Sequence, residues 1–372
     1  KTSPRPSAAC TSSPRATDRQ GYRTMTMQEM IAKIGSGQKT SKDLTWEESK
    51  QAMRALIEGR ATPAQIGAFL LAMRLKMESV TELAAFTSAA REYAAPVPVP
   101  QGLALVDLPV YGGKQDTFHA SIGAAVVAAA GGAVILMHGH DIIPKRPGPA
   151  GVLTKLGIAT ELAPKQAADE LATKGFAYLD MALYHPSVAK FLDLRLELGV
   201  RNLFHPVARM LNPARAGVQI VGLTHPPYFE KTAEALSMLG CRQALIIRGI
   251  EGSPELSIAA ATKVLELRGD RITPLMLHPK DAGVPLGTHQ PMAGFPPGQA
   301  DKEADLLRKI LLNQVRGGQR DWVLLNAALF LYAAGKAASV QAGAKLAQQA
   351  LDSGAAARKL NELAVVKETI HV

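Results

Sequence analysis

The sequence predicts an α/β fold in which a small helical domain precedes a larger domain with a mostly parallel sheet. Residues 26–93 show helical periodicity, a proline-rich segment follows, and short β-like runs then alternate with helical segments. Such alternation is typical of parallel sheets, because parallel neighbours need a crossover connection between them. With 372 residues and 47% hydrophobic content, the chain is long enough for two domains.

The helical region contains two helix-start signals. Thr45 is followed three residues later by Glu48, which predicts a capping box, and Thr62 directly precedes Pro63 at a first helical position. Apolar residues then recur at helical spacing, namely Met53, Leu56, Ile57, Ile66, Phe69, Leu70 and Met73. The alternating prolines of residues 95–100 exclude a helix interior and predict a stiff linker. We therefore expect a helical domain over 25–95 and an α/β domain over 96–372.

The larger region carries the strand candidates. They are residues 105–110, 134–137, 220–223 and 244–248. Helices are expected between them, for example at 121–130 and 231–239, and in the C-terminal third, at 321–334 and 339–353. These last helices are placed to cover the sheet.

Charge and composition bear on partners and compartment. Residues 1–24 are rich in Ser, Thr, Pro and Arg, so they are expected to form a disordered tail. The formal net charge of the chain is +10. A basic balance favours anionic partners such as nucleic acid or phosphorylated metabolites, although a merely solvated cationic surface gives the same count. No stretch is long and apolar enough for a membrane span, and Cys10 and Cys241 are not expected to pair, which favours a cytoplasmic protein.

A phosphate-binding turn is expected where the first strand meets the following helix. Gly112 and Gly113 end the strand, and the hydroxyl residues Thr117 and Ser121 lie near the start of the helix. Glycines let backbone amides approach a phosphate, and a helix N-terminus adds about half a positive charge. Lys114 supplies an ammonium group to this turn. The segment is therefore suited to holding phosphate.

Several longer motifs carry a family resemblance. They are Leu-Tyr-His-Pro from residue 183, Arg-Leu-Glu-Leu-Gly-Val-Arg-Asn from 195, Leu-Asn-Pro-Ala from 211, Leu-Leu-Asn-Ala-Ala from 324 and Leu-Asp-Ser-Gly-Ala-Ala from 351. With them the chain resembles the anthranilate phosphoribosyltransferase family, glycosyltransferase family 3, over about 26–363. The resemblance implies a nucleoside phosphorylase/phosphoribosyltransferase-like fold, a helical domain that forms a homodimer, and a cleft between the domains. Residues 182–202 are then expected to pack on the helical domain.

Two phosphate-binding motifs of that family are altered here. Of the family's Gly-Thr-Gly-Gly-Asp turn only the glycine pair matches, and its aspartate position holds Lys114. The following Asn-Ile-Ser-Thr begins with His119 instead of asparagine. In the Lys-His-Gly-Asn-Arg motif Met137 replaces the lysine, while His138 and Gly139 remain and are expected to bind ligand. The chain thus lacks one phosphate charge partner.

The expected metal and acceptor positions are partly kept. The family's metal-associated Asp-Glu pair is Pro254 and Glu255 here, and Glu251 is a possible substitute for the lost carboxylate. The resemblance implies that Arg201 holds the anthranilate carboxylate, and Asn212 also matches. We assign no catalytic residue, because the groups that stabilise a departing diphosphate are incomplete.

These departures make nucleic-acid binding the leading hypothesis. The chain is similar to a non-biosynthetic branch that binds DNA or RNA without sequence preference and without a cofactor. The cations expected to contact the nucleic acid are Lys114, Lys145, Arg146, Arg195, Arg201 and Arg209. The alternative is an active transferase that uses Mg²⁺ and passes the phosphoribosyl group from phosphoribosyl diphosphate to an aromatic amine. Another phosphorylated small molecule remains open as the ligand.

The histidines are interpreted conservatively. His119, His138, His140 and His205 do not form a recognised zinc array, so zinc is disfavoured. His205 is expected either to line the cleft or to lie in the interior, and His185 is expected to orient a loop or cap a helix.

Overall fold

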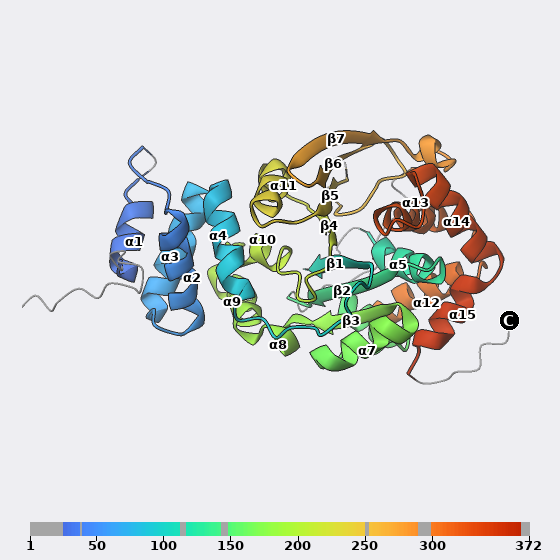
Figure 1. Ribbon diagram of the computed structural model, residues 1–372, viewed down its shortest axis with the longest axis horizontal. Helices are drawn as coiled ribbons and strands as arrows, with labels where there is room; N and C mark the ends of the chain where they lie inside the picture. Colours follow the sequence, from blue (N-terminus) through green and yellow to red (C-terminus); the bar gives the residue numbers. More distant parts are fainter. Residues whose placement is uncertain are drawn as a thin grey trace, which may run out of the picture.

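The computed structural model describes residues 25–37, 39–111, 117–142, 148–249, 253–288 and 299–365. Within these ranges a helical domain lies at one end of the molecule, beside a larger α/β domain built around one sheet (Figure 1). The helical domain consists of α1 (Met27–Ile34), α2 (Trp46–Ile57), α3 (Pro63–Lys76) and α4 (Val80–Arg91). No helix in the described ranges is both long and apolar enough to cross a membrane.

Capping boxes begin all four of these helices. The Thr45 hydroxyl accepts the backbone N–H of Glu48 at 3.3 Å, and Thr62 caps α3 in the same way. Thr26 and Ser79 cap α1 and α4, two helix starts that were not predicted from the sequence. Each cap satisfies a backbone N–H that the first helical turn leaves without a partner. Both predicted helix starts are confirmed.

A seven-stranded sheet forms the centre of the larger domain, in the order β3-β2-β1-β4-β5-β6-β7. Its strands are β1 (Leu105–Tyr111), β2 (Val134–His140), β3 (Phe176–Asp180), β4 (Val218–Gly222), β5 (Gln243–Arg248), β6 (Thr262–Arg268) and β7 (Arg271–Leu277). The first five are parallel, whereas β6 and β7 pair antiparallel. The four predicted strands are present, and the mostly parallel sheet is confirmed.

Helices cover both faces of this sheet (Figure 1). Along β1, Val106 and Leu108 enter a core shared with α5, α12 and α13, whereas Leu105 enters a core that extends to the helical domain. The remaining elements are α5 (Ala120–Ala130), α6 (Pro149–Lys155), α7 (Pro164–Lys174), α8 (Met181–Tyr184), α9 (Pro186–Leu198), α10 (Phe204–Ala208), η1 (Pro226–Tyr228), α11 (Phe229–Met238), η2 (Pro279–Ala282), α12 (Ala300–Leu311), α13 (Gly318–Ala333), α14 (Val340–Asp352) and α15 (Ala355–Leu363).

Buried hydrogen bonds join the two domains. The His185 ring nitrogen Nε2 lies 2.8 Å from the carbonyl oxygen of Ala90, at the end of α4. His185 also caps α9, so its predicted orienting role is confirmed. At the other end of α4, the Tyr228 hydroxyl donates to Oε2 of the buried Glu78, which precedes the helix, at 2.6 Å. These two bonds therefore hold the helical domain against the larger domain, beside the expected ligand cleft.

Candidate functional site

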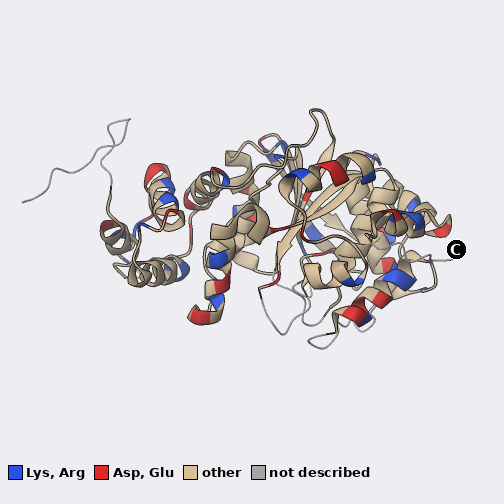
Figure 2. Cartoon of the chain, turned by 90° about the horizontal axis from the view of Figure 1, so that it is seen from below, with Lys and Arg blue, Asp and Glu red and all other residues tan. Residues whose placement is uncertain are grey.

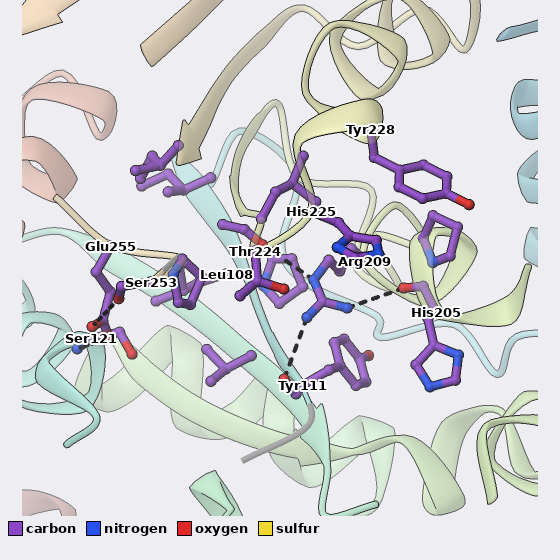
Figure 3. Close-up of a pocket in the computed structure, with 18 of the residues that line it drawn as sticks. Leu108, Tyr111, Ser121, His205, Arg209, Thr224, His225, Tyr228, Ser253 and Glu255 are labelled. Atoms are coloured by element: carbon purple, nitrogen blue, oxygen red, sulfur yellow. Dashed lines mark hydrogen bonds between the residues drawn. The ribbon is translucent and has the colours of Figure 1, made fainter. Parts of the chain in front are cut away.

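A cavity of about 250 Å³ opens at the carboxyl ends of β1, β4 and β5. β1 pairs with β2 on one side and β4 on the other, so the direction in which the chain adds strands reverses beside β1. Ligands of open α/β sheets bind in the crevice at such a reversal. The topology thus places a binding cleft where the structure has its cavity (Figure 3).

Arg209 lies at the centre of this cleft (Figure 3). Its guanidinium donates to three backbone carbonyl oxygens, those of His205 at 3.1 Å, Gly222 at 3.2 Å and Tyr111 at 3.4 Å. Burial and the charge of Arg201 lower the pKa of Arg209 to about 10, so the side chain remains charged at neutral pH. Arg209, a predicted nucleic-acid contact, therefore binds together three chain segments that form the cleft.

Cations dominate the cleft wall. Among the described lining residues the charged groups are Arg74, Arg195, Arg201, Arg209 and Glu255. Arg201 donates through Nη1 to the Thr224 hydroxyl at 3.2 Å, beyond the end of β4. Arg74 comes from the helical domain, whereas Arg195 comes from α9. The excess of positive charge favours an anionic ligand.

Burial and the neighbouring arginines keep two histidines of the cleft neutral. Burial, followed by the charges of Arg209, Arg195 and Arg201, lowers the pKa of His205 to about 3. Burial and the charge of Arg201 also lower the pKa of His225. Both rings are therefore uncharged at neutral pH and can accept a proton or a hydrogen bond. His205 both lines the cleft and is mostly buried, so the two expectations for it are met together.

The cleft's one described carboxylate is engaged by protein groups. Glu255 is 2% exposed, and its Oε1 accepts the backbone N–H of Ser121 in the first turn of α5 at 2.9 Å. The Ser253 hydroxyl donates to the other oxygen at 3.3 Å. Pro254 packs so closely on β4 that a Cβ at Gly222 would lie 2.2 Å from its carbonyl oxygen. The segment is thus fitted tightly to the end of β4.

The buried residues beside α5 form a second polar contact. His119 directly precedes α5, and its Nδ1 lies 2.6 Å from Oε1 of Glu303 in α12. The same oxygen accepts the His119 backbone N–H at 2.5 Å. Both side chains are 1% exposed, and His119 lines the cleft. The sequence offers no sign of this pair, because 184 residues separate its members.

Three predicted ligand residues lie away from the cleft. His138 is fully buried, with Nδ1 2.6 Å from the Tyr111 hydroxyl and Nε2 3.1 Å from Asp107. Gly139 belongs to β2 and faces Val110 closely. Asn212 closes a turn by accepting the N–H of Ala216 at 2.7 Å. These residues organise the interior behind the cleft, and the structure gives them no contact with it.

The other predicted residues divide by location. Thr117, Ser121, Arg195, Arg201, Arg209 and Glu255 all line the cleft. Gly112, Gly113, Lys114, Lys145, Arg146 and Glu251 lie outside the described residues. Arg74 and Tyr228 are among the lining residues that were not predicted as site residues. Arg74 stands in no motif of the sequence, and only the packing of the two domains brings it to the same cleft as Tyr228.

The family resemblance implies magnesium, so the donor set matters. Within the described ranges no three His, Cys, Asp or Glu side chains are grouped as they would be around a metal ion. The cleft supplies Glu255, which is already hydrogen-bonded to Ser121. Magnesium usually takes one or two carboxylates together with substrate phosphates. The described residues alone therefore do not build a magnesium site.

Comparison with known proteins identifies the same two-domain arrangement. The a/b domain of the glycosyl transferase family matches residues 104–357, and the family's helical bundle domain matches 28–94. Anthranilate phosphoribosyltransferase of Rubrobacter xylanophilus is 35% identical over 345 residues, which cover 92% of this chain and 98% of that enzyme. The enzyme of Desulfitobacterium hafniense strain Y51 is 36% identical over 321 residues, covering 86% and 94% of the two chains.

Solved structures agree with these relatives. The crystal structure of anthranilate phosphoribosyltransferase from Thermus thermophilus superposes with a TM-score of 0.80 at 31% identity, over 90% of this chain and 98% of that one. The Saccharomyces cerevisiae enzyme, in complex with PRPP and Mg, gives 0.78 at 19% identity, over 91% and 96% of the chains. The yeast comparison supports the fold alone.

Proposed function

This chain belongs to glycosyltransferase family 3, the family of the anthranilate phosphoribosyltransferases, and on that premise we propose that it is a phosphoribosyltransferase. In this proposal the donor is phosphoribosyl diphosphate, and the acceptor is an aromatic amine that carries a carboxylate, as anthranilate does. The non-biosynthetic, nucleic-acid-binding assignment ranks second, because the relatives reported above are all anthranilate phosphoribosyltransferases.

The proposal rests on one observation, that the two ends of the cavity offer different chemical groups to a ligand. At one end Arg201 is held beside Thr224, and a guanidinium is suited to a carboxylate because it offers paired donors. At the other end lies the start of α5 with Thr117 and Ser121, whose hydroxyl groups can donate hydrogen bonds to phosphate oxygens. A substrate pair that combines a carboxylate with a diphosphate matches both ends.

The proposed transfer forms one bond and breaks another. The amine nitrogen uses its lone pair to bond C1 of the ribose, and the bond from C1 to the diphosphate oxygen breaks with its electron pair on the diphosphate. The amine then loses a proton, which a neutral histidine can accept. His225 is uncharged at neutral pH and follows Thr224 directly, so it is the residue we assign to that proton. Arg201 then orients the acceptor.

In the proposed reaction, any magnesium ion arrives bound to the substrate. The yeast relative is described in complex with PRPP and Mg. In this chain Glu255 is the one described carboxylate of the cleft, and its two oxygens already accept hydrogen bonds from Ser121 and Ser253. The cationic residues of the cleft supply the stabilisation of the departing charge that the protein itself contributes.

The decisive assay follows the fluorescence of anthranilate. We expect its loss when the protein is supplied with phosphoribosyl diphosphate and Mg²⁺, with one diphosphate released per anthranilate consumed. The Arg201→Met variant serves as the site control and Arg271→Met, on the exposed face of β7, as the matched surface control. If the wild-type protein binds phosphoribosyl diphosphate but consumes none, the transferase proposal fails.

A homodimer is part of the proposal. Leu71 and Leu75 of α3 are 47% and 76% exposed, and Leu196 of α9 is 57% exposed. Leu71 and Leu75 lie one helical turn apart on α3, and exposed apolar side chains grouped in this way mark protein contact surfaces. Light scattering of the wild-type protein and of Leu75→Arg tests this assignment, with a dimer expected for the first and a monomer for the second. A monomeric wild-type protein would remove it.

Nucleic-acid binding is the second candidate, favoured by the charge of the cleft. Four arginines line the described wall against one carboxylate, and Pro254 stands where the family has an acid. Against it, Lys and Arg are interspersed with Asp and Glu along the helices coloured in Figure 2. In this second candidate function, Arg195, Arg201 and Arg209 of the cleft would contact the nucleic acid, and Lys114, Lys145 and Arg146 are further contacts expected from the sequence alone.

A further inference from the structure

A second cavity, of about 380 Å³, opens at the edge of the sheet opposite the cleft. It is lined by Gly217, which precedes β4, and by Arg242, which precedes β5. The cleft, in contrast, is lined by Gly222 and Ile247 near the carboxyl ends of the same two strands. Because β4 and β5 are parallel, the two cavities lie at opposite ends of these strands. The volume of the second cavity is in the range of small-molecule sites.

The charged groups of this second cavity are all cations. Among its described lining residues they are Arg91, Arg215 and Arg242, and none of these lining residues is an Asp or Glu. Asp107 attracts Arg91 from the interior, but it is fully buried and its Oδ1 lies 3.1 Å from Nε2 of His138. Like charges around one cavity repel one another, and a bound anion would replace that repulsion with attraction.

A fixed turn positions Arg215. Asn212 closes this turn, because its Oδ1 accepts the backbone N–H of Ala216 at 2.7 Å and its carbonyl oxygen accepts the N–H of Arg215 at 3.0 Å. Arg215 has a φ of 51°, in the left-handed region that is uncommon for residues other than glycine and asparagine. Such backbone conformations cluster at binding sites, where they hold a side chain in a required place. The exposed Arg215 side chain is therefore carried by a rigid support.

Arg242 is positioned from the other side of the cavity. Its carbonyl oxygen accepts the N–H of Gly269 at 2.8 Å, in the turn between β6 and β7. Its guanidinium lies over Gly217, where a Cβ would collide with it. Within the described part of the chain, the side chains of Arg215 and Arg242 form no hydrogen bond and no ion pair with the protein. Their donors therefore remain available to a ligand.

Arg91 brings the helical domain to the same cavity. It is the last residue of α4, and its Nε and Nη2 both donate to the carbonyl oxygen of Met210, at 3.1 and 2.6 Å. A guanidinium has five N–H donors, so these bonds fix the group and leave further donors for a ligand. Ala94 and Pro96 of the linker also line the cavity. A ligand bonded to Arg91 and Arg242 together would join the two domains.

We propose that this second cavity is a binding site for a small phosphate-bearing molecule, with the phosphate group bonded by Arg91, Arg215 and Arg242. The paired donors of a guanidinium match the oxygens of a phosphate, and several guanidinium groups together balance a dianion. The lining converges from both domains and from the linker, an arrangement that suits a compact ligand. The site is separate from the cleft and does not rest on the proposed transferase activity.

NMR spectra of the full chain, labelled with ¹³C and ¹⁵N in arginine, test this site directly. Single substitutions assign the guanidinium signals of the three arginines. Titration with inorganic phosphate at constant ionic strength should shift these signals along one saturating curve. Arg215→Met and Arg242→Met should each weaken the binding about 10-fold or more, since each removes charge-assisted hydrogen bonds. Arg215→Lys keeps the charge and should weaken it less than Arg215→Met.

Controls separate this site from the cleft and from general charge effects. Arg215 and Arg242 are exposed, so their substitution should leave the protein folded. Arg271→Met, on the exposed face of β7, should bind phosphate at the second cavity as the wild type does. Arg201→Met alters the cleft and should leave the same curve unchanged. Malonate at equal ionic strength should bind more weakly than phosphate, because a carboxylate offers fewer oxygens to a cluster of guanidinium groups.

Three results would overturn the inference. The first is a set of shifts that do not saturate, or a curve that Arg215→Met and Arg242→Met both leave unchanged. The second is equal affinity for malonate, which would make the cavity a general anion site. The third is a short oligonucleotide that displaces phosphate at a lower concentration, which would assign these arginines to nucleic acid. Because the signals report on the second cavity alone, these results leave the proposed transferase standing, and a failed transferase assay leaves this inference standing.

Discussion

Nε of Arg209 donates to the carbonyl oxygen of Gly222 at 3.2 Å, which fixes the last residue of β4 against the segment that follows α10. The same guanidinium also bonds the carbonyl oxygens of His205 and Tyr111. Three backbone acceptors therefore depend on one side chain, and the floor of the cleft depends on its planar, forked shape.

Arg209→Lys should destabilise the fold although it keeps the charge. A lysine has one nitrogen and cannot satisfy three divergent acceptors, so at least one buried carbonyl loses its partner. We expect a loss of about 2–4 kcal/mol in the free energy of unfolding. Urea titration measures it, with Arg271→Lys on exposed β7 as the control. Equal stability of the two variants would show that the three bonds carry little energy.

Arg201 should act on the acceptor alone. If it binds the acceptor carboxylate, Arg201→Met should raise KM for anthranilate by roughly 10-fold to 100-fold, since charge-assisted hydrogen bonds contribute about 1.5–3 kcal/mol each. KM for phosphoribosyl diphosphate should change little, because that ligand lies at the α5 end. Steady-state kinetics with each substrate varied in turn gives both constants. An equal effect on the two would place Arg201 outside the acceptor pocket.

Acid should destabilise the protein through His205. Its pKa is about 3 in the folded state against 6.5 ordinarily, so the unfolded chain binds the extra proton between these values. Stability therefore falls as the pH drops below about 6.5. His205→Asn removes this penalty, and at pH 4.5 it should recover about 2–3 kcal/mol relative to its own effect at pH 7.5. Urea titrations at the two pH values measure the difference. Parallel pH profiles for both proteins would contradict the shift.

The nucleic-acid hypothesis predicts a salt dependence. If the cleft mouth neutralises phosphates, log affinity for duplex DNA should fall linearly with log salt, by about 0.9 per phosphate contacted, whatever the base sequence. A chain beginning at Met25 removes the basic tail, and Lys114→Asp then reverses one charge at the turn. We expect weaker binding and a shallower slope in Lys114→Asp. Binding that disappears with residues 1–24 would assign it to the tail.

The sequence predicts elements where local chemistry decides them. Thr45 and Thr62 begin helices because their hydroxyls cap the neighbouring backbone, and this signal lies within four residues. Four strands of the parallel core are apolar runs that were recognised from the sequence, whereas β3, a run of five residues, was not predicted. β6 and β7 are also missed. Charged residues interrupt the mostly buried β6, and β7 alternates exposed with half-buried residues, so the pairing of both becomes evident only beside β5.

The site is predicted less completely, for a physical reason. Arg201 and Glu255, both singled out through the resemblance, line one cleft although they come from distant parts of the chain. It also suggests His138 as a ligand residue, whereas the pleat of β2 turns that ring into the interior toward Asp107. Whether a side chain faces the cleft or the core changes with a single position along a strand. Sequence motifs alone do not record that choice.

The bond between the Tyr228 hydroxyl and Glu78 has a consequence for how the cleft can change over time. Tyr228 and Arg74 form one wall of the cleft, and Arg74 belongs to the helical domain. The opposite wall, at α5, belongs wholly to the α/β domain. Substitutions in the small domain, or in the proline-rich linker, can therefore reshape the acceptor end and leave the phosphate end intact. Acceptor preference and phosphate recognition can therefore change independently of each other during evolution.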